Sequence, residues 1–246
     1  MIPLKDRNPT ASFPAVTLAL IAANVGMYFL FQHGTLSLGD PSSRAYLCNL
    51  GEYAAVPREL THAGFELGSC GGQPPSHWIT PFTAMFMHGG LLHLGGNMLF
   101  LWVFGNNVED AMGRVKFLAF YILGGLAALA LQVLVEPSSA VPTIGASGAV
   151  AGVLGGYILL FPRARVWTFV WIVVLPIPAL VVLGFWFLQQ VAFGYFGLTD
   201  PTVGVGTGGG VAYFAHIGGF VFGLATVRAW VARRRPVEPA RFGGLS

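Results

Sequence analysis

The sequence predicts an all-α fold, a polytopic membrane bundle of six transmembrane helices, from its composition, its glycine content and its apolar runs. Of the 246 residues, 54% are hydrophobic and only 9% are Asp, Glu, Lys or Arg, whereas soluble domains carry about 25% charged residues. Glycine is frequent, with 34 residues, as in closely packed membrane helices. This composition excludes a soluble globular domain, a disordered chain and a coiled coil.

Six apolar runs supply the helices, and each is compared with the roughly 20 residues that cross a hydrocarbon core about 30 Å thick. The first run follows Lys5 and Arg7 and is expected to be retained, since no small-residue cleavage site follows it. The fourth is too short to cross alone, so its outer end is expected to open into a water-filled hollow. The runs are Phe13–Phe31, Leu91–Phe104, Phe117–Val135, Ser147–Phe161, Ala179–Phe196 and Val211–Val227.

The stretch around the fifth run needs a separate interpretation. Residues 166–196 hold too many apolar residues for one span and too few for two. Because Pro176 and Pro178 interrupt this stretch, the segment Trp167–Ile177 is expected to lie along the membrane interface, with the fifth helix beginning near Pro178.

The placement of Lys and Arg predicts the orientation. With six spans, 11 of the 13 Lys and Arg residues fall on one side and only Arg44 and Arg58 on the other, so both termini are predicted to be cytoplasmic. Because the charges lie between the apolar runs and not on one stripe, nucleic acid is not expected as a partner. The chain is expected to be a multi-pass protein, of the cell or inner membrane if it is bacterial.

These assignments divide the chain into three parts. Residues 1–12 form a cytoplasmic N-terminal segment, residues 13–232 form the membrane domain, and residues 233–246 form a basic cytoplasmic tail. The membrane domain includes a large outside loop over residues 32–80.

Two cysteines, Cys48 and Cys70, fall in the outside loop. One disulfide is expected if that loop faces an oxidising compartment, and two unpaired thiols are the alternative. No metal-ligand spacing accompanies them, so no metal and no organic cofactor is expected.

Four polar residues lie at a similar depth within the predicted spans. Polar groups are costly there and are functional candidates by default, and no Asp or Glu lies in any of the six spans. At a rise of about 1.5 Å per residue, all four fall roughly 18–25 Å above the cytoplasmic ends of their helices. They are His93 and Asn97 in the second span, Ser147 at the start of the fourth and His216 in the sixth.

Small residues favour close packing of the fourth span against the sixth. They flank the serine in Gly145–Gly148 and leave its hydroxyl unobstructed. Glycines spaced four apart let two helices pack backbone to backbone, which would bring Ser147 Oγ within hydrogen-bond reach of His216. Without a membrane acid for a triad, a Ser–His dyad is what remains. The spaced glycines are Gly148, Gly152 and Gly156 in the fourth span, and Gly219 and Gly223 in the sixth.

His93 and Asn97 are four residues apart and share one helix face. Both can donate hydrogen bonds to a developing oxyanion, where one donor is worth about 10²–10³ in rate. The plainer interpretations are that a membrane serine bonds back to its own helix and that a lone histidine bonds a neighbouring one. Four polar groups at one depth favour a catalytic site.

The motifs resemble those of the rhomboid intramembrane serine proteases. The family's G-x-S-G stands here as Gly145–Gly148, its A-H-x-x-G-x-x-x-G as Ala215–Gly223, and its H-x-x-x-x-H-x-x-x-N as His88–Asn97. The resemblance runs from about Trp78 to Arg234 with the family's order and spacing.

The resemblance implies Ser147 as nucleophile and His216 as general base and acid. With the Ser147 N–H, His93 and Asn97 would form the oxyanion hole, and the site would open to the non-cytoplasmic side. Glu109 would be structural, at the cytoplasmic end of the second helix. Residues that would support the site are Gly145, Gly148, His88, Gly219 and Gly223.

One position departs from the pattern. Some family members carry a tyrosine one turn after the serine, and this tyrosine stacks on the catalytic histidine. The residue here is Ala151, so another group must orient His216.

The predicted function is hydrolysis of peptide bonds in or near the transmembrane segments of single-span or other membrane proteins within the lipid bilayer. A segment must unwind to expose its carbonyl, so substrates with Gly, Pro or polar residues are expected. They would enter laterally past the fifth helix, where Phe185, Trp186 and Phe187 either form a gate or face lipid.

Other classes are weighed against this function. A metalloprotease would need a spacing such as His-Glu-x-x-His, and an aspartyl protease would need two membrane acids; neither is present. A transporter or channel would also explain a polar cavity, but no inverted repeat supports it. The main alternative is a non-catalytic rhomboid-like protein that binds transmembrane clients without cutting them. The sequence carries no signal for the oligomeric state.

Overall fold

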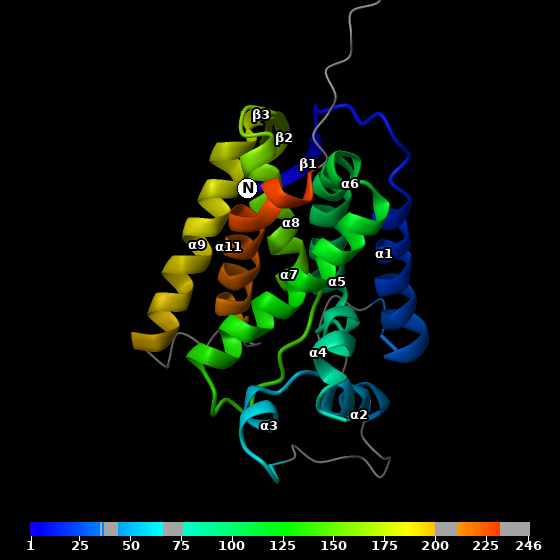
Figure 1. Ribbon diagram of the computed structural model, residues 1–246, viewed down its shortest axis with the longest axis vertical. Coiled ribbons are helices and arrows are strands. Elements are labelled where there is room, and N and C mark those ends of the chain that lie inside the picture. Colours follow the sequence, from blue (N-terminus) through cyan, green and yellow to red (C-terminus); the bar gives the residue numbers. More distant parts are fainter. Residues whose placement is uncertain (35, 37–43, 66–75, 200–210, 232–246) are drawn as a thin grey trace, which may run out of the picture.

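The computed structural model is a helical bundle with a small antiparallel sheet at one end (Figure 1). It describes residues 1–34, 36, 44–65, 76–199 and 211–231. Among these, the helices that match the six apolar runs are α1 (Ala15–Gly26), α5 (Leu91–Phe100), α7 (Arg114–Val135), α8 (Ser147–Leu160), α9 (Ala179–Thr199) and α11 (Tyr213–Trp230). Shorter helices are α2 (Arg44–Tyr53), α3 (Pro57–Thr61), α4 (Thr80–Thr83) and α6 (Asn106–Met112).

Two of the predicted spans are longer than one regular helix. The first continues past α1 as a π-helical turn (Met27–Phe31), and the second continues past α5 through another π-helical turn (Leu101–Gly105) into α6. By length and composition alone, α7 and α9 are long and apolar enough to cross a membrane. The described part of the chain also holds two shorter apolar helices, α1 with its π turn and α8.

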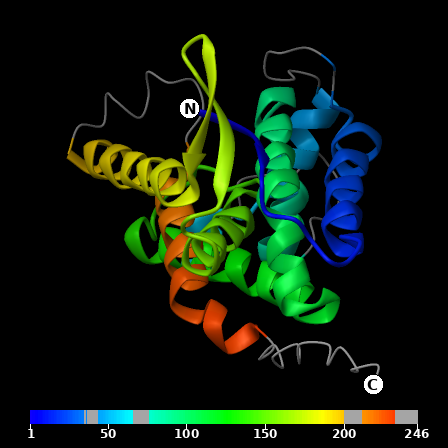
Figure 2. The ribbon, with the colours of Figure 1, turned by 90° about the horizontal axis from the view of Figure 1, so that it is seen from above.

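Helix α8 is the central helix of the bundle. Most of its 14 residues are buried, and the view from above shows it enclosed by its neighbours (Figure 2). It packs against α7, α9 and α11. Its first residue, Ser147, therefore lies inside the molecule and not at either end.

Glycines determine how closely α8 approaches α11. A Cβ placed on Gly219 would collide with the carbonyl oxygen of Gly148, and one on Gly223 would collide with that of Gly152. These collisions mean that the two backbones are in direct contact, as the spaced glycines predict. On α8, Gly155 makes the same kind of contact with the backbone of α11.

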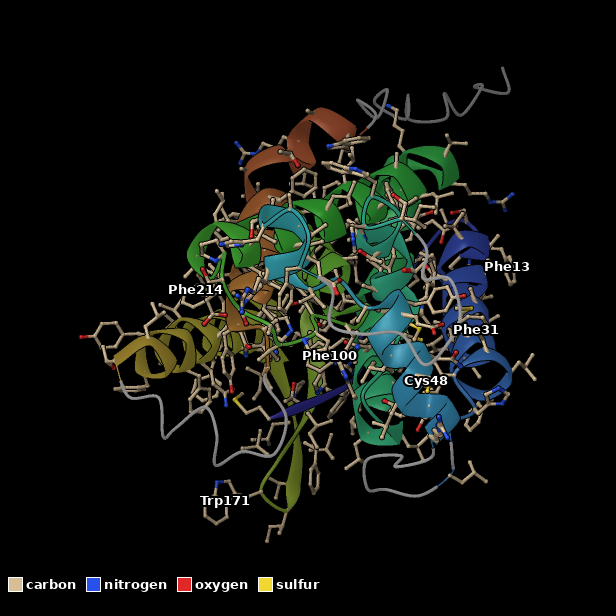
Figure 3. All side chains as sticks on the ribbon, turned by 90° about the horizontal axis from the view of Figure 1, so that it is seen from below. Phe13, Phe31, Cys48, Phe100, Trp171 and Phe214 are labelled. Atoms are coloured by element: carbon tan, nitrogen blue, oxygen red, sulfur yellow. The ribbon has the colours of Figure 1, made fainter. Side chains whose placement is uncertain are left out.

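The expectation of an all-α chain is wrong for three short segments, which are β-strands. Arg165–Val170 (β2) and Val173–Pro178 (β3) form an antiparallel hairpin, and Ile2–Asp6 (β1) pairs with β2 to complete a three-stranded sheet. The hairpin includes most of the segment Trp167–Ile177, which was expected to lie along the interface. β-branched and aromatic residues fill β2 and favour a strand, and Trp171 at the tip adopts a φ of 58°. It points away from the bundle and is 90% exposed (Figure 3).

Two carboxylates of α6 hold the start of α1. Glu109, only 1% exposed, accepts hydrogen bonds from the Val16 and Thr17 backbone N–H groups at 3.0 and 2.8 Å. Asp110 accepts one of 2.9 Å from the Ser12 N–H. An acid at a helix N-terminus accepts hydrogen bonds from the free N–H groups and interacts favourably with the helix dipole. The expected structural role of Glu109 is therefore confirmed.

A buried carboxylate fastens the sheet to the bundle. Asp6 of β1 accepts hydrogen bonds of 2.7 Å from Asn107 Nδ2 of α6 and from the Tyr157 hydroxyl of α8. Burial raises the pKa of the Asp6 carboxyl above its usual value of 3.8, although the Tyr157 hydrogen bond acts in the opposite direction.

The opposite end of the bundle carries α2, α3 and α4 (Figure 1). Cys48 of α2 is disulfide-bonded, which agrees with the bridged alternative. Cys70 and the predicted basic tail, 233–246, lie outside the described residues.

The glycine contact generates a first prediction. Gly223→Ala is expected to lower the free energy of unfolding by about 1–3 kcal/mol, because the new methyl group meets backbone that cannot move aside. Gly184→Ala in α9 is the control, since a Cβ there has no atom within 4 Å. Thermal unfolding in detergent, followed by circular dichroism, measures both. Equal midpoints for the two variants would contradict the backbone contact.

The Asp6 network generates a second prediction. Because folding raises this pKa, the contribution of Asp6 to stability is complete below pH 3.8 and is lost as the pH rises through the raised value. Relative to Asp6→Asn, which keeps an accepting oxygen, the wild type should lose stability over that interval. Denaturation at a series of pH values measures the difference between the two proteins, and parallel curves would count against the raised pKa.

Candidate active site

Ser147 and His216 meet at the contact between α8 and α11. Ser147 is the first residue of α8, and His216 lies in the first turn of α11. The His216 Nε2 atom is 2.7 Å from Ser147 Oγ, which is a hydrogen-bond distance. The predicted proximity of these two side chains is confirmed, and it follows from the glycine-lined packing of their helices.

The other ring nitrogen of His216 contacts Gln190 of α9. His216 Nδ1 lies 2.8 Å from Gln190 Oε1, while Gln190 Nε2 donates a hydrogen bond of 3.3 Å to the Trp186 carbonyl oxygen. An amide oxygen only accepts hydrogen bonds. In this arrangement Nδ1 therefore carries the ring proton, and Nε2 accepts from the Ser147 hydroxyl.

The same helix covers the histidine ring. The Trp186 indole packs against His216 with ring centroids 5.8 Å apart and planes 36° apart. Ala151 lies at the contact between α8 and α11, since a Cβ on Gly219 would lie 3.3 Å from the Ala151 Cβ. The aromatic ring that packs on His216 thus comes from α9 and not from α8.

The sequence analysis did not identify Gln190 as a residue of the site. It named Trp186 only as one of three aromatic residues that form a gate or face lipid. The available signal is Gln189–Gln190, a pair of amides inside the fifth apolar run. In the structure Gln189 is exposed and Gln190 is buried. Which of the two faces the core depends on the rotation of α9.

His93 and Asn97 of α5 lie against the backbone just before Ser147. Gly145 has a φ of 114°, and a Cβ there would lie 2.7 Å from His93 Nε2 and 3.5 Å from Asn97 Nδ2. The Gly89 N–H donates to His93 Nδ1 at 3.2 Å, so a neutral His93 carries its proton on Nε2. Asn97 Nδ2 is buried without a hydrogen-bond partner among the described residues. Two N–H donors thus lie beside the loop that precedes Ser147.

His88 supports this arrangement from behind. It precedes α5, is fully buried, and its ring meets the His93 ring edge-on, with centroids 5.2 Å apart. Its backbone is held by Gln32, which accepts from the His88 N–H at 2.9 Å, and by the Tyr46 hydroxyl, which donates to the His88 carbonyl at 2.6 Å.

The loop before Ser147 is held from the outside-loop end of the bundle. Ala55 and Thr143 exchange two backbone hydrogen bonds, of 3.2 and 2.8 Å, and the Gly145 N–H donates to the Ala84 carbonyl at 2.9 Å. Beside Ser147 lies a hollow lined mainly by small residues. Its lining includes Ala55, Ala84, Gly125, Ala128, Gly145, Gly148 and Ala149.

Gln132 of α7 is a second buried amide that the sequence did not single out. Its Oε1 accepts a hydrogen bond of 3.2 Å from the Ala215 N–H, and its Nε2 donates to Glu136. The hydrogen bond to the Ala215 N–H holds the first turn of α11 at the residue before His216. The histidine is therefore positioned from three helices, α7, α8 and α9.

Comparison with known proteins identifies relatives. The Rhomboid domain model matches residues 75–233. Mitochondrial rhomboid protein 1 of Saccharomyces cerevisiae is 30% identical over 243 residues, which cover 88% of this chain and 63% of the relative. Rhomboid protease GluP of Bacillus subtilis is 32% identical over 152 residues, covering 61% of this chain and 26% of the relative. RHOMBOID-like protein 4 of Arabidopsis thaliana is 35% identical over 139 residues, covering 56% and 30%. The chain thus spans less than two thirds of the length of these relatives.

The position of Gly145 generates a third prediction. Gly145→Ala is expected to slow the reaction of Ser147 with a fluorophosphonate probe at least about tenfold, because its Cβ would displace the His93 ring, whose Nε2 would lie 2.7 Å away, and so remove one oxyanion donor. Gly64→Ala controls for backbone strain alone, since Gly64 has a φ of 81° and no atom within 4 Å of its Cβ position. The labelling rate in detergent is measured for both variants. Equal labelling rates for the two variants would contradict a role of the donors beside Gly145 in the reaction of Ser147.

Proposed function

The chain belongs to the rhomboid family of integral membrane proteins, and from this premise we propose that it is an intramembrane serine endopeptidase. It hydrolyses peptide bonds in or near the transmembrane segments of other membrane proteins. The observation that carries the proposal is the distance of 2.7 Å between His216 Nε2 and Ser147 Oγ. In the proposed reaction Ser147 is the nucleophile and His216 is the general base and acid.

The first half of the reaction forms an acyl-enzyme. Ser147 Oγ attacks the scissile carbonyl carbon while His216 Nε2 accepts the hydroxyl proton. The oxyanion of the tetrahedral intermediate accepts hydrogen bonds from His93 and Asn97. When the C–N bond breaks, His216 gives the proton to the leaving amine.

The second half releases the acid product. A water molecule loses a proton to His216 and attacks the acyl carbon, and the protonated histidine then returns the proton to Ser147 Oγ. No external oxidant or reductant is needed. A single histidine serves both halves, because its Nε2 alternately accepts and donates the proton.

The substrate is a transmembrane protein that can unwind locally. A helix in lipid keeps its carbonyls bonded within itself, so Gly, Pro or polar residues near the cleaved bond favour attack. The small residues around the hollow beside Ser147 support a small side chain next to the scissile carbonyl.

The proposal includes six spans with both termini in the cytoplasm. The charge distribution supports it, as does the position of β1 and the C-terminal end of α11 at one end of the bundle, opposite α2 and α3 (Figure 1). In this orientation residues 1–12 and 233–246 are cytoplasmic, residues 13–232 form the membrane domain, and the active site opens to the non-cytoplasmic side.

In this proposal substrates enter past α9, and the three aromatic residues predicted there differ in their contacts. Phe185 is 53% exposed and remains a gate candidate. Phe187 instead stacks on Phe220 of α11, with centroids 4.4 Å apart, and Trp186 covers His216. Phe100 of α5 faces Trp186 across the proposed entrance, with centroids 6.3 Å apart.

A cleavage assay provides the fourth prediction. In liposomes with a tagged single-span substrate, wild type should cut, while Ser147→Ala and His216→Ala should lose activity. Asn97→Ala should retain about 10⁻²–10⁻³ of the rate, the usual effect of losing one oxyanion donor. Ser139→Ala is the control, a serine of the loop before α8.

The outcomes separate the two functions. If Ser147→Ala cuts as fast as wild type, the nucleophile assignment is wrong. If wild type cuts none of several substrates and Ser147 does not react with a fluorophosphonate, the chain is a non-catalytic protein that binds transmembrane clients.

A further inference from the structure

We propose that Gln190 is a positioning residue that holds His216 in the one tautomer able to act as a base toward Ser147. This inference rests on the proposed function. It assigns to a neutral amide on α9 the place that an acid occupies in a Ser–His–Asp triad. The juxtaposition that carries it is the contact of 2.8 Å between Gln190 Oε1 and His216 Nδ1.

The orientation of the amide is fixed at both ends. Its nitrogen donates to the Trp186 carbonyl of the preceding turn at 3.3 Å, and its oxygen faces His216 Nδ1. A reversed amide would aim its NH₂ group at Nδ1, which would have to become the acceptor. The ring proton would then sit on Nε2, and Nε2 could no longer take the proton from the Ser147 hydroxyl.

The position of Gln190 is costly for an ordinary packing residue. The side chain is 7% exposed on a helix that is apolar enough to cross a membrane, and a polar group there is a functional candidate. Its sequence neighbour Gln189, about 100° away around the same helix, is exposed. Of the two amides, only Gln190 lies on the face of α9 that contacts His216.

The helices that meet at His216, α8, α9 and α11, offer no carboxylate for this role. Between Glu136 and Asp200 the chain contains no Asp or Glu, and after Asp200 the next acid is Glu238 in the C-terminal tail. Trp186 covers the face of the His216 ring and leaves its edge to Gln190. The Trp186 contact restricts the tilt of the His216 ring, and the Gln190 contact keeps the ring proton on Nδ1.

The test compares Gln190→Met with Gln189→Met. Methionine keeps the length and helix propensity of glutamine but offers no strong acceptor. Gln190→Met should lower kcat for a transmembrane substrate in liposomes about 10- to 100-fold, the range found when the outer partner of a metal-bound histidine is lost. KM should change little, and fluorophosphonate labelling of Ser147 should slow in parallel. Gln189→Met should behave as wild type.

Two further variants separate positioning from packing. Gln190→Glu keeps an accepting oxygen at the same distance and should restore most of the labelling rate. Gln190→Asn keeps an amide but withdraws it by one methylene, so it should be as slow as Gln190→Met. If Gln190→Met does not fold, Gln190→Asn takes its place.

A spectroscopic measurement reports the tautomer without catalysis. With ¹⁵N-labelled histidine, the His216 resonances are identified by their loss in His216→Ala. Wild type should show a protonated Nδ1, and Gln190→Met a mixture of tautomers. Unchanged kcat, labelling and tautomer in Gln190→Met would overturn the positioning role. A wild type that neither cuts nor labels but holds the Nδ1–H tautomer would instead overturn the proposed protease function.

Discussion

The backbone contact between α8 and α11 is the constraint on which the rest of the structure depends. Any side chain at Gly219 or Gly223 would clash with a backbone carbonyl oxygen of α8. The two helices can therefore approach this closely only along their glycine faces. That approach places a residue at the start of α8 beside one in the first turn of α11, and these are Ser147 and His216. Because residue 151 is an alanine, the aromatic ring that packs on His216 is that of Trp186 on α9, and Gln190 of the same helix contacts its Nδ1.

The buried carboxylates of the bundle, Asp6 and Glu109, both accept hydrogen bonds. Carboxylates are confined to places where they cap or join elements: Glu109 at the N-terminus of α1, and Asp6 between β1, α6 and α8. Around the serine the groups are neutral amides, imidazoles and backbone N–H groups. Buried side-chain atoms without a partner among the described residues include Asn97 Nδ2 and both ring nitrogens of His88. The unsatisfied Asn97 donor is destabilising in the resting protein, and in the proposed reaction it is available to the oxyanion.

Much of the fold and of the candidate site follows from the sequence for identifiable reasons. Helix length, charge placement and four-residue glycine spacing are local patterns, and they predicted the helices and the meeting of Ser147 with His216. The hairpin was missed because a short apolar run does not distinguish a strand from a buried helix. Gln190 was missed for a different reason. The sequence shows two adjacent amides, and only the rotation of α9, which is set by its packing against α11, decides that Gln190 faces the histidine and Gln189 does not.

The choice of an amide over a carboxylate follows from where the site lies. A carboxylate beside His216 would stabilise the imidazolium formed during the proposed reaction. In the resting state, however, it would be a buried charge beside a neutral imidazole, and a buried charge in a membrane helix is costly. An amide oxygen accepts the same Nδ1–H hydrogen bond without that cost, because it remains neutral throughout. It cannot offset the positive charge of the imidazolium, however, so the intermediate of the proposed reaction depends more on the N–H donors of His93 and Asn97. The start of α8 inside the bundle serves this chemistry, since it places Ser147 within hydrogen-bond distance of His216 and two residues after Gly145, which both donors approach.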